Sequence, residues 1–270
     1  MDLIIKSIIM GVVEGLTEFL PISSTGHLIV AGKLLQFPDR IASSFEIFIQ
    51  LGAIIAVLVF FARDLINLIQ RAIKRERGAI NLLIATAIAF VPAALVGLAF
   101  RTQIKTLLFN PVSVAIALIV GGIVMLLAER YIAGRKATVI NLDKIGSREA
   151  AAIGAAQVLS LIPGTSRSMT TIVGGLLVGL DRVTATRFSF YLSIPTLGIA
   201  TVYELAKEYK SITSPDLLAF FVGALVSFGV ALVVIKFFLG YIAGHTFKWF
   251  GWYRIAAGAL MLLLFAPIFN

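Results

Sequence analysis

The chain has 270 residues, of which 59% are hydrophobic and only 14% are charged; soluble domains carry about a quarter charged residues. Apolar runs of roughly twenty residues recur along it, which excludes an ordinary soluble domain and predicts an all-α polytopic membrane protein. The net charge of +9 then indicates loops that face anionic lipid, and we expect no nucleic-acid partner. The sequence has no cysteine, which excludes disulfides and thiolate metal sites.

The first segment of the chain, residues 3–36, is mostly apolar but is interrupted by Leu-Pro-Ile-Ser-Ser-Thr-Gly. Each half has about fifteen residues, or roughly 22 Å of helix, which is shorter than a hydrocarbon core of about 30 Å. This pattern predicts a re-entrant helical hairpin that turns at mid-depth, where irregular backbone is tolerated only inside protein or beside a wet cavity. We expect no cleaved signal peptide, because the first residues lack a basic region and a small-residue cleavage site.

Six full spans and a second hairpin are predicted beyond this segment. The six spans cover about 43–62, 79–100, 111–131, 184–206, 215–239 and 251–268. The second hairpin covers 147–179 and is interrupted by Ile-Pro-Gly-Thr-Ser-Arg-Ser. Each half of the chain therefore contains one re-entrant hairpin followed by three transmembrane helices.

The two halves are related by a weak sequence repeat. Pro21-Ile-Ser-Ser aligns with Pro163-Gly-Thr-Ser at an offset of 142 residues. Because three spans is an odd number, the second half must be inverted relative to the first, and the hairpin tips then meet near the midplane. We therefore predict one membrane domain with an inverted repeat. The domain covers 1–270, and its two repeats cover 1–135 and 136–270.

Lysine and arginine are distributed unequally between the two predicted sides. The side that holds the N-terminus carries seven of them, and the other side carries fourteen. Because cytoplasmic loops are enriched in these residues, we expect both termini to lie outside.

Glu14 and Glu18 lie on one face of the first half-helix, because they are four residues apart. Two carboxylates at this spacing repel each other, and each charge is costly in hydrocarbon. The pair therefore requires a bridging metal, a protonated member or a nearby cation. The alternative is a solvated pair near a helix end that has no function. The position of Glu18, only three residues before the break at Pro21, argues against this alternative. In the first full span, Glu46 and Gln50 either reach the same cavity or pack as polar residues of that helix.

Hydroxyl side chains follow both breaks. Ser23, Ser24 and Thr25 are good N-cap residues for the second half-helix. A helix N-terminus at mid-depth also directs free N–H groups and the positive end of its dipole inward, which suits an anion such as phosphate. Thr165 and Ser166 repeat this arrangement in the second hairpin.

Arg167 and His27 complete the polar cluster. Arg167 offers paired donors for phosphate oxygens, although it could instead form an internal ion pair that opens for substrate. His27 lies one turn from Ser23 and Ser24. A lone histidine in an apolar helix is usually a satisfied hydrogen-bonder, but these neighbours favour acid–base or nucleophilic function. An anion site beside two carboxylates predicts phosphoryl transfer on a lipid-borne phosphate.

At these motifs the sequence resembles the undecaprenyl-diphosphate phosphatases, the bacitracin-resistance membrane phosphatase family. The resemblance extends over essentially the whole chain and is strongest at 14–27, 45–54, 162–168 and 188–195. It implies removal of the terminal phosphate from the C55 isoprenoid diphosphate, which regenerates the lipid carrier of cell-wall precursors. It also implies a divalent cation, magnesium or calcium, a similar fold, and an active site that opens to the outer face of the bacterial cytoplasmic (inner) membrane.

The residue pattern and the resemblance together give the polar residues their expected roles. The implied metal ligands are Glu14 and Glu18. The expected phosphate-binding residues are Ser23, Thr25, Thr165, Ser166 and Arg167. The expected catalytic residues are Glu18, Ser24, His27 and Arg167.

We expect Ser24 to attack the terminal phosphorus while Glu18 or His27 accepts its proton, after which water releases phosphate. The same residues are also compatible with His27 itself, or a metal-bound water, as the nucleophile. Inverted repeats with broken helices are also a transporter architecture, so a transporter or flippase of an anionic or lipid-phosphate substrate is the alternative function. The expected partners are the isoprenoid diphosphate and membrane lipid, and homodimer formation is left open.

Overall fold

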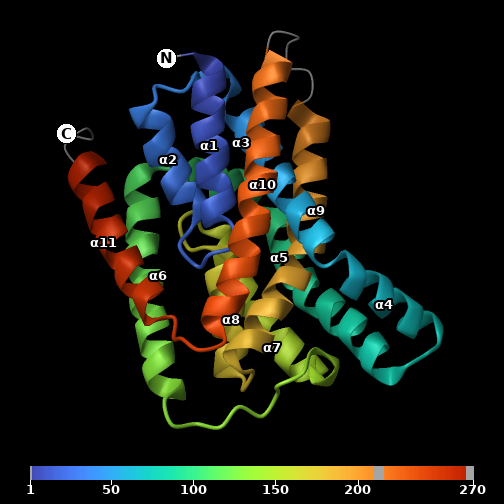
Figure 1. Cartoon of the computed structure of the whole chain (residues 1–270). Helices are drawn as coiled ribbons and strands as arrows, with labels where there is room; N and C mark the ends of the chain where they lie inside the picture. Colours follow the sequence, from blue (N-terminus) through green and yellow to red (C-terminus); the bar gives the residue numbers. More distant parts are fainter. Residues whose placement is uncertain (1, 209–215, 266–270) are drawn as a thin grey trace.

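The computed structural model describes residues 2–208 and 216–265, and regular structure within these ranges is helical, with no strand. The α-helices are Leu3–Thr17 (α1), Ser24–Leu34 (α2), Asp39–Phe60 (α3), Ala62–Ile73 (α4), Arg77–Leu108 (α5), Pro111–Ile132 (α6), Ser147–Val158 (α7), Arg167–Leu177 (α8), Arg182–Glu208 (α9), Leu217–Ile242 (α10) and Lys248–Phe265 (α11). Two short 3₁₀ helices are Leu142–Lys144 (η1) and Leu159–Leu161 (η2). Figure 1 shows these elements as one bundle.

Four of the described helices are long and apolar enough to cross a membrane, namely α3, α5, α6 and α10. They coincide with four predicted spans, so the multi-pass, all-helical class is confirmed. The other two predicted spans correspond to α9 and α11, which are not among the described helices that are long and apolar enough by this test. Residues 215 and 266–268 of the predicted spans, and Lys210 of the charge comparison, lie outside the described residues.

Two pairs of short helices occupy the centre of the bundle (Figure 1). The first pair is α1 and α2, and the second is α7 and α8 with η2 between them. The pairs start from opposite ends of the bundle, and their connecting loops lie side by side in its middle. The hydroxyl of Ser168 donates to the carbonyl oxygen of Leu20 over 2.9 Å, which joins the first turn of α8 to the loop after α1.

The same local conformation follows each loop. Ser23 and Ser166 are the N-caps of α2 and α8, and both have left-handed backbones, with φ of 72° and 73°. Their hydroxyls accept hydrogen bonds from the N–H groups of Gly26 and Met169. Left-handed conformations are uncommon and strained for residues other than glycine, and such strain concentrates at functional sites. The matched geometry supports the weak sequence repeat.

Close helix packing through small residues holds the surrounding helices in place. α1 packs against α10, and α6 packs against α11. A Cβ added to Gly11 would lie 2.4 Å from the carbonyl oxygen of Gly223, so only glycine permits this approach of α1 to α10. Small residues are typical of such interfaces in membranes, where the hydrophobic effect does not drive helices together.

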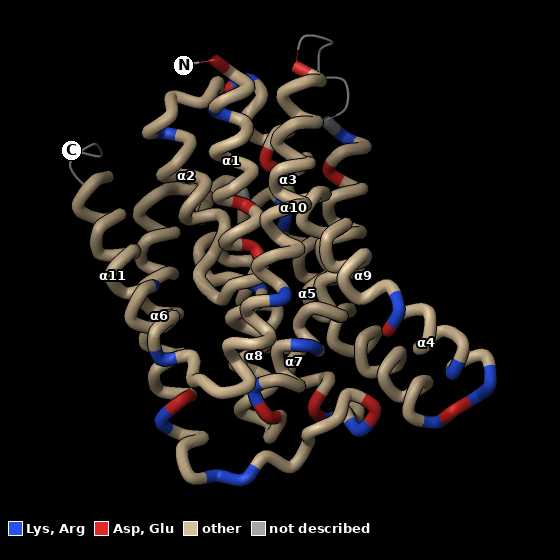
Figure 2. Tube along the Cα trace, in the orientation of Figure 1, with Lys and Arg blue, Asp and Glu red and all other residues tan. Residues whose placement is uncertain are grey.

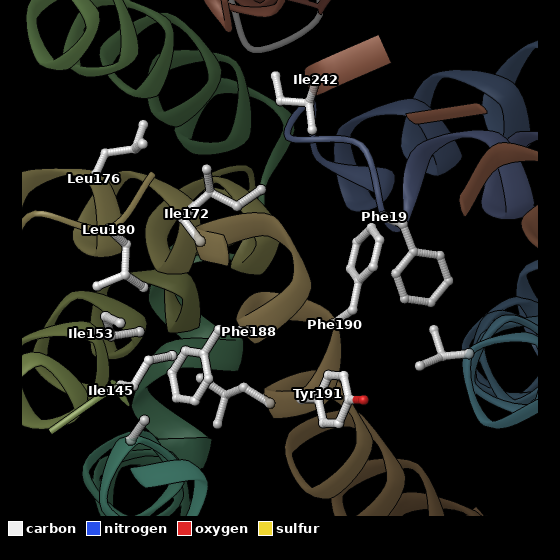
Figure 3. Packing of buried hydrophobic residues seen from close by; sticks show 14 of the residues in the cluster. Phe19, Ile145, Ile153, Ile172, Leu176, Leu180, Phe188, Phe190, Tyr191 and Ile242 are labelled. Atoms are coloured by element: carbon white, nitrogen blue, oxygen red, sulfur yellow. The ribbon is translucent and has the colours of Figure 1, made fainter. Parts of the chain in front are cut away.

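An aromatic and aliphatic core supports the loop after α1 (Figure 3). Phe19 is fully buried and meets Phe190 edge to face, with ring centroids 5.4 Å apart. Phe190 lies on α9, one residue from Ser189. The core therefore fixes the position of the loop relative to α9.

Charged residues are concentrated at the two ends of the bundle, with few between them (Figure 2). α1 begins and α11 ends at the same end of the bundle (Figure 1).

The short helix α4 was not predicted. Three isoleucines of α4 are exposed, namely Ile66, Ile69 and Ile73. Their spacing of three and four residues is typical of one face of a helix and could have predicted α4.

Candidate active site

The centre of the site is an ion pair between the two loops. Glu18 is the C-cap of α1, and Arg167 is the first residue of α8. Nη2 of Arg167 donates to Oε1 of Glu18 over 3.2 Å, and both side chains are less than a tenth exposed, at 7% and 6%. Residues from the two hairpins, distant in sequence, therefore form one buried site.

The second oxygen of Glu18 binds the predicted nucleophile. Oγ of Ser24 donates to Oε2 of Glu18 over 2.6 Å. This distance is within the reach required of a general base and the hydroxyl that it deprotonates. One carboxylate thus contacts both the Ser24 hydroxyl and the Arg167 guanidinium.

α9 completes the environment of Arg167. Nη1 of Arg167 donates to the carbonyl oxygen and to Oγ of Ser189, over 3.1 and 3.2 Å. The Ser189 hydroxyl also hydrogen-bonds that of Thr171 over 2.7 Å. Sequence analysis assigned no role to Ser189, although it lies in the segment 188–195 that carries part of the family resemblance. Its contacts orient the guanidinium fork toward Glu18.

Glu14 differs from Glu18 in having no hydrogen-bond partner within the described residues for either carboxylate oxygen, although it is only 1% exposed. Glu18 and Glu46 both lie close enough to repel its charge. An isolated buried carboxylate is costly, so this position requires a proton or a cation. Carboxylate oxygens suit magnesium and calcium, and magnesium typically uses one or two carboxylates together with substrate phosphate and water.

The described residues do not by themselves form a complete cation site. No group of three or more His, Asp or Glu side chains within residues 2–208 and 216–265 has the arrangement of metal ligands. The unpaired oxygens of Glu14 nevertheless fit a cation whose other ligands come from substrate or water.

His27 lies beside the central cluster and forms two hydrogen bonds elsewhere. Its Nδ1 is 2.7 Å from the carbonyl oxygen of Ser23, and its Nε2 is 2.6 Å from the hydroxyl of Tyr253 on α11. The rings of His27 and Tyr253 are parallel, with an interplanar angle of 3°. Tyr253 was not identified from the sequence, because only the tertiary structure brings α11 next to α2.

The remaining predicted residues occupy the edges of the two loops. Thr25 is half-buried in the first turn of α2. Ser166 hydrogen-bonds Ser168 over 3.0 Å. Thr165 is half-buried and lines an apolar cavity between α6, α7 and α8. Gln50 accepts a hydrogen bond from Thr201, so it joins α3 to α9.

Arg254 is a fully buried arginine that contacts both loops. Its guanidinium donates to the carbonyl oxygens of Pro21 and Gly164 over 3.2 and 3.1 Å, and to that of Ala117 on α6 over 3.2 Å. The sequence did carry a signal for this residue, since a lone arginine in an apolar span is a functional candidate by default. Arg254 therefore fastens the two loops to each other and to α6.

Replacing Arg254 by methionine is expected to destabilise the protein by about 3 kcal/mol or more. The substitution leaves three carbonyl oxygens without their donor, and each such loss costs about 1–3 kcal/mol. Thermal unfolding of the purified variant in detergent measures the effect. Arg187→Met, which removes a more exposed ion pair with Asp64, is the control and should cost less than about 1 kcal/mol. Equal unfolding midpoints for the two variants would contradict this role.

Comparisons with known proteins show the family to which the chain belongs. The family model described as Bacitracin resistance protein BacA matches residues 7–260. The protein named undecaprenyl-diphosphatase from Caldanaerobacter subterraneus subsp. tengcongensis is 49% identical, over 98% of this chain and 97% of its own. Undecaprenyl-diphosphatase 1 from Chromobacterium violaceum is also 49% identical, over 96% of each chain. The chain therefore belongs to the bacitracin resistance protein BacA family.

Proposed function

We propose that this protein is an integral-membrane phosphatase that hydrolyses undecaprenyl diphosphate to the monophosphate and inorganic phosphate, and so recycles the lipid carrier of cell-wall synthesis. Relatives that match nearly the whole chain carry the name undecaprenyl-diphosphatase. The observation that carries the proposal is the contact of Glu18 with both Arg167 and Ser24 where the two loops meet.

In the proposed mechanism, Arg167 and the N–H groups at the start of α2 and α8 bind the terminal phosphate. The Arg167–Glu18 pair opens far enough to admit a phosphate oxygen. Oγ of Ser24 attacks the terminal phosphorus, the bond to the bridging oxygen breaks, and the lipid monophosphate leaves. Glu18 takes the Ser24 proton and gives it to the departing oxygen of the lipid monophosphate. Glu18 then deprotonates the water that attacks the phosphoserine, and this proton returns to Oγ of Ser24 as inorganic phosphate leaves. The 2.6 Å contact supports Glu18 as the base, whereas His27 is bonded to Ser23 and Tyr253.

We also propose that Glu14 and Glu18 hold a divalent cation, magnesium or calcium. When bound, it neutralises charge on the diphosphate. The unpaired, buried oxygens of Glu14 support this assignment.

Replacing Glu14 by glutamine is expected to raise the magnesium concentration needed for half-maximal activity by roughly 10- to 100-fold, because one charged ligand is lost. Phosphate release measured across a magnesium titration, after treatment with a chelator, tests this. Glu76→Gln alters an exposed ion pair with Arg71 and should leave the titration unchanged. An identical magnesium response of the Glu14 variant and the unaltered protein would remove Glu14 from the cation site.

For the membrane arrangement we propose the inverted repeat of 1–135 and 136–270, with six spans and two re-entrant hairpins. The opposed helix pairs and the matched serine caps support it. We place both termini, and the opening of the active site, on the outer face of the cytoplasmic (inner) membrane. Because the chain has no cysteine, single variants test this cleanly. An impermeant thiol reagent on intact cells should label Lys6→Cys but not Lys136→Cys.

Purified protein in detergent with undecaprenyl diphosphate and magnesium distinguishes hydrolysis from transport. An enzyme releases inorganic phosphate without any gradient, and chelator stops the release if the cation is required. A transporter or flippase releases none. Homodimer formation stays a prediction.

A further inference from the structure

Two cavities lie between α11 and the first helix pair. The larger, of about 770 Å³, lies against α1 and the loop that follows it, and the smaller, of about 310 Å³, lies against α2. Three residues line both cavities, namely Val13, His27 and Tyr253. The hydrogen-bonded pair of His27 and Tyr253 therefore stands where the two cavities adjoin, and we name them together the α11 groove.

The α11 groove is lined mostly by apolar side chains. In the larger cavity, the polar exceptions beside the two tryptophans are Thr17, His27 and Tyr253. The smaller is lined by residues such as Val30, Leu34, Met261 and Leu264. From Trp249 to Leu264, α11 extends over roughly 22 Å at 1.5 Å per residue. The groove is thus long and its lining is mostly apolar.

His27 links the groove to the phosphate end of the site by a hydrogen bond. Nδ1 of His27 bonds the carbonyl oxygen of Ser23, which is the N-cap of α2, and Ser24 follows it in the chain. A molecule that placed a phosphate at Ser24 would therefore present its other end to the groove.

We propose that the α11 groove binds the isoprenoid chain of the lipid diphosphate, with Tyr253 and His27 at the junction of head group and chain. This rests on the proposed function and deepens it. A hydrocarbon chain is recognised by apolar surface alone, and each buried methylene contributes about 0.8 kcal/mol. Tyrosine suits such a junction, because its ring is apolar while its hydroxyl needs a hydrogen-bond partner, here His27.

A second apolar cavity, of about 460 Å³ between α6, α7 and α8, is the competing location. Thr165 is the only predicted site residue in its lining. Thr170 in its lining donates to the carbonyl oxygen of Arg167 over 3.0 Å. However, no residue of this lining bonds the backbone next to the predicted nucleophile Ser24, as His27 does. The geometry therefore favours the α11 groove, and a variant in the second cavity provides the matched control.

The test compares three tryptophan substitutions in nanodiscs, with undecaprenyl diphosphate and the short-chain farnesyl diphosphate as substrates. Ala256→Trp fills the α11 groove, Val120→Trp fills the second cavity, and Leu225→Trp lies on the exposed face of α10. Ala256→Trp is expected to raise KM for undecaprenyl diphosphate about tenfold or more while the farnesyl reaction changes little. The two controls should behave like the unaltered protein.

An effect of Val120→Trp in place of Ala256→Trp, or an equal loss on both substrates, would overturn the inference while leaving the phosphatase function intact. Failure of the unaltered protein to hydrolyse either substrate would overturn the function itself and this inference with it.

A binding measurement on the unaltered chain covers the case in which Ala256→Trp does not fold. Both tryptophans of the protein, Trp249 and Trp252, line the larger cavity. Undecaprenyl monophosphate should therefore change the tryptophan emission, and inorganic phosphate should not. Trp252→Phe should reduce the change. If the tryptophan emission does not change when the lipid is added, the α11 groove is not the binding site of the isoprenoid chain.

Discussion

Replacing Arg167 by alanine is expected to lower kcat/KM for undecaprenyl diphosphate by about 10³-fold or more. Arginines that stabilise a transferring phosphoryl group contribute roughly 10³- to 10⁵-fold. In this protein the same guanidinium also neutralises Glu18 inside a buried pair. Its loss therefore removes a phosphate donor and alters the proposed base at the same time.

Arg167→Lys separates charge from geometry. Lysine keeps the positive charge but cannot reach Glu18 and Ser189 together as the guanidinium fork does. We expect it to recover only a small part of the lost activity. Removing one partner of a buried pair also costs about 3–5 kcal/mol of stability, so thermal unfolding should be recorded beside the kinetics. A folded Arg167→Ala protein with near-normal kcat/KM would refute the proposed site.

Replacing Ser24 by alanine is expected to abolish turnover, with a fall in kcat of about 10³-fold or more, as for other residues that form a covalent intermediate. The Ser24 hydroxyl is the one that Glu18 holds in the structure. Thr86→Ala is the matched control. The Thr86 hydroxyl donates to the carbonyl oxygen of Leu82 within α5, away from the site, so its removal should leave kcat unchanged.

Chemical trapping identifies the nucleophile directly. With substrate labelled in its terminal phosphate, rapid quenching should place the label on Ser24 of the unaltered protein. Label on His27 would transfer the nucleophilic role to the imidazole. An unlabelled protein that still releases phosphate in a burst-free reaction would instead favour direct attack by water.

The tight contacts of the centre have a consequence for substrate entry. In the described residues, Glu18 contacts both Ser24 and Arg167, so these groups satisfy one another before a phosphate arrives. A dianionic phosphate must therefore compete with Glu18 for the guanidinium. A cation beside Glu14 would weaken the hold of Glu18 on Arg167, and in this way cation binding and substrate binding support each other.

The sequence by itself determined the class of this protein and the positions of its breaks. Apolar runs without water for the backbone must be helical, and the breaks predicted at Pro21 and Pro163 lie a few residues after the ends of α1 at Thr17 and α7 at Val158. The residues Glu14, Glu18, Ser24 and Arg167 stood out because polar groups are costly in an apolar sequence.

Only the tertiary structure decided which of these groups meet. The repeat predicted that the two loops meet, but Glu18 and Arg167 are 149 residues apart in sequence, and no local pattern specified this particular contact. The contacts of Ser189, Tyr253 and Arg254 are likewise made between helices that are distant in the chain. Helix periodicity shows which face of a helix is polar, but the partner of that face depends on how all the helices pack together.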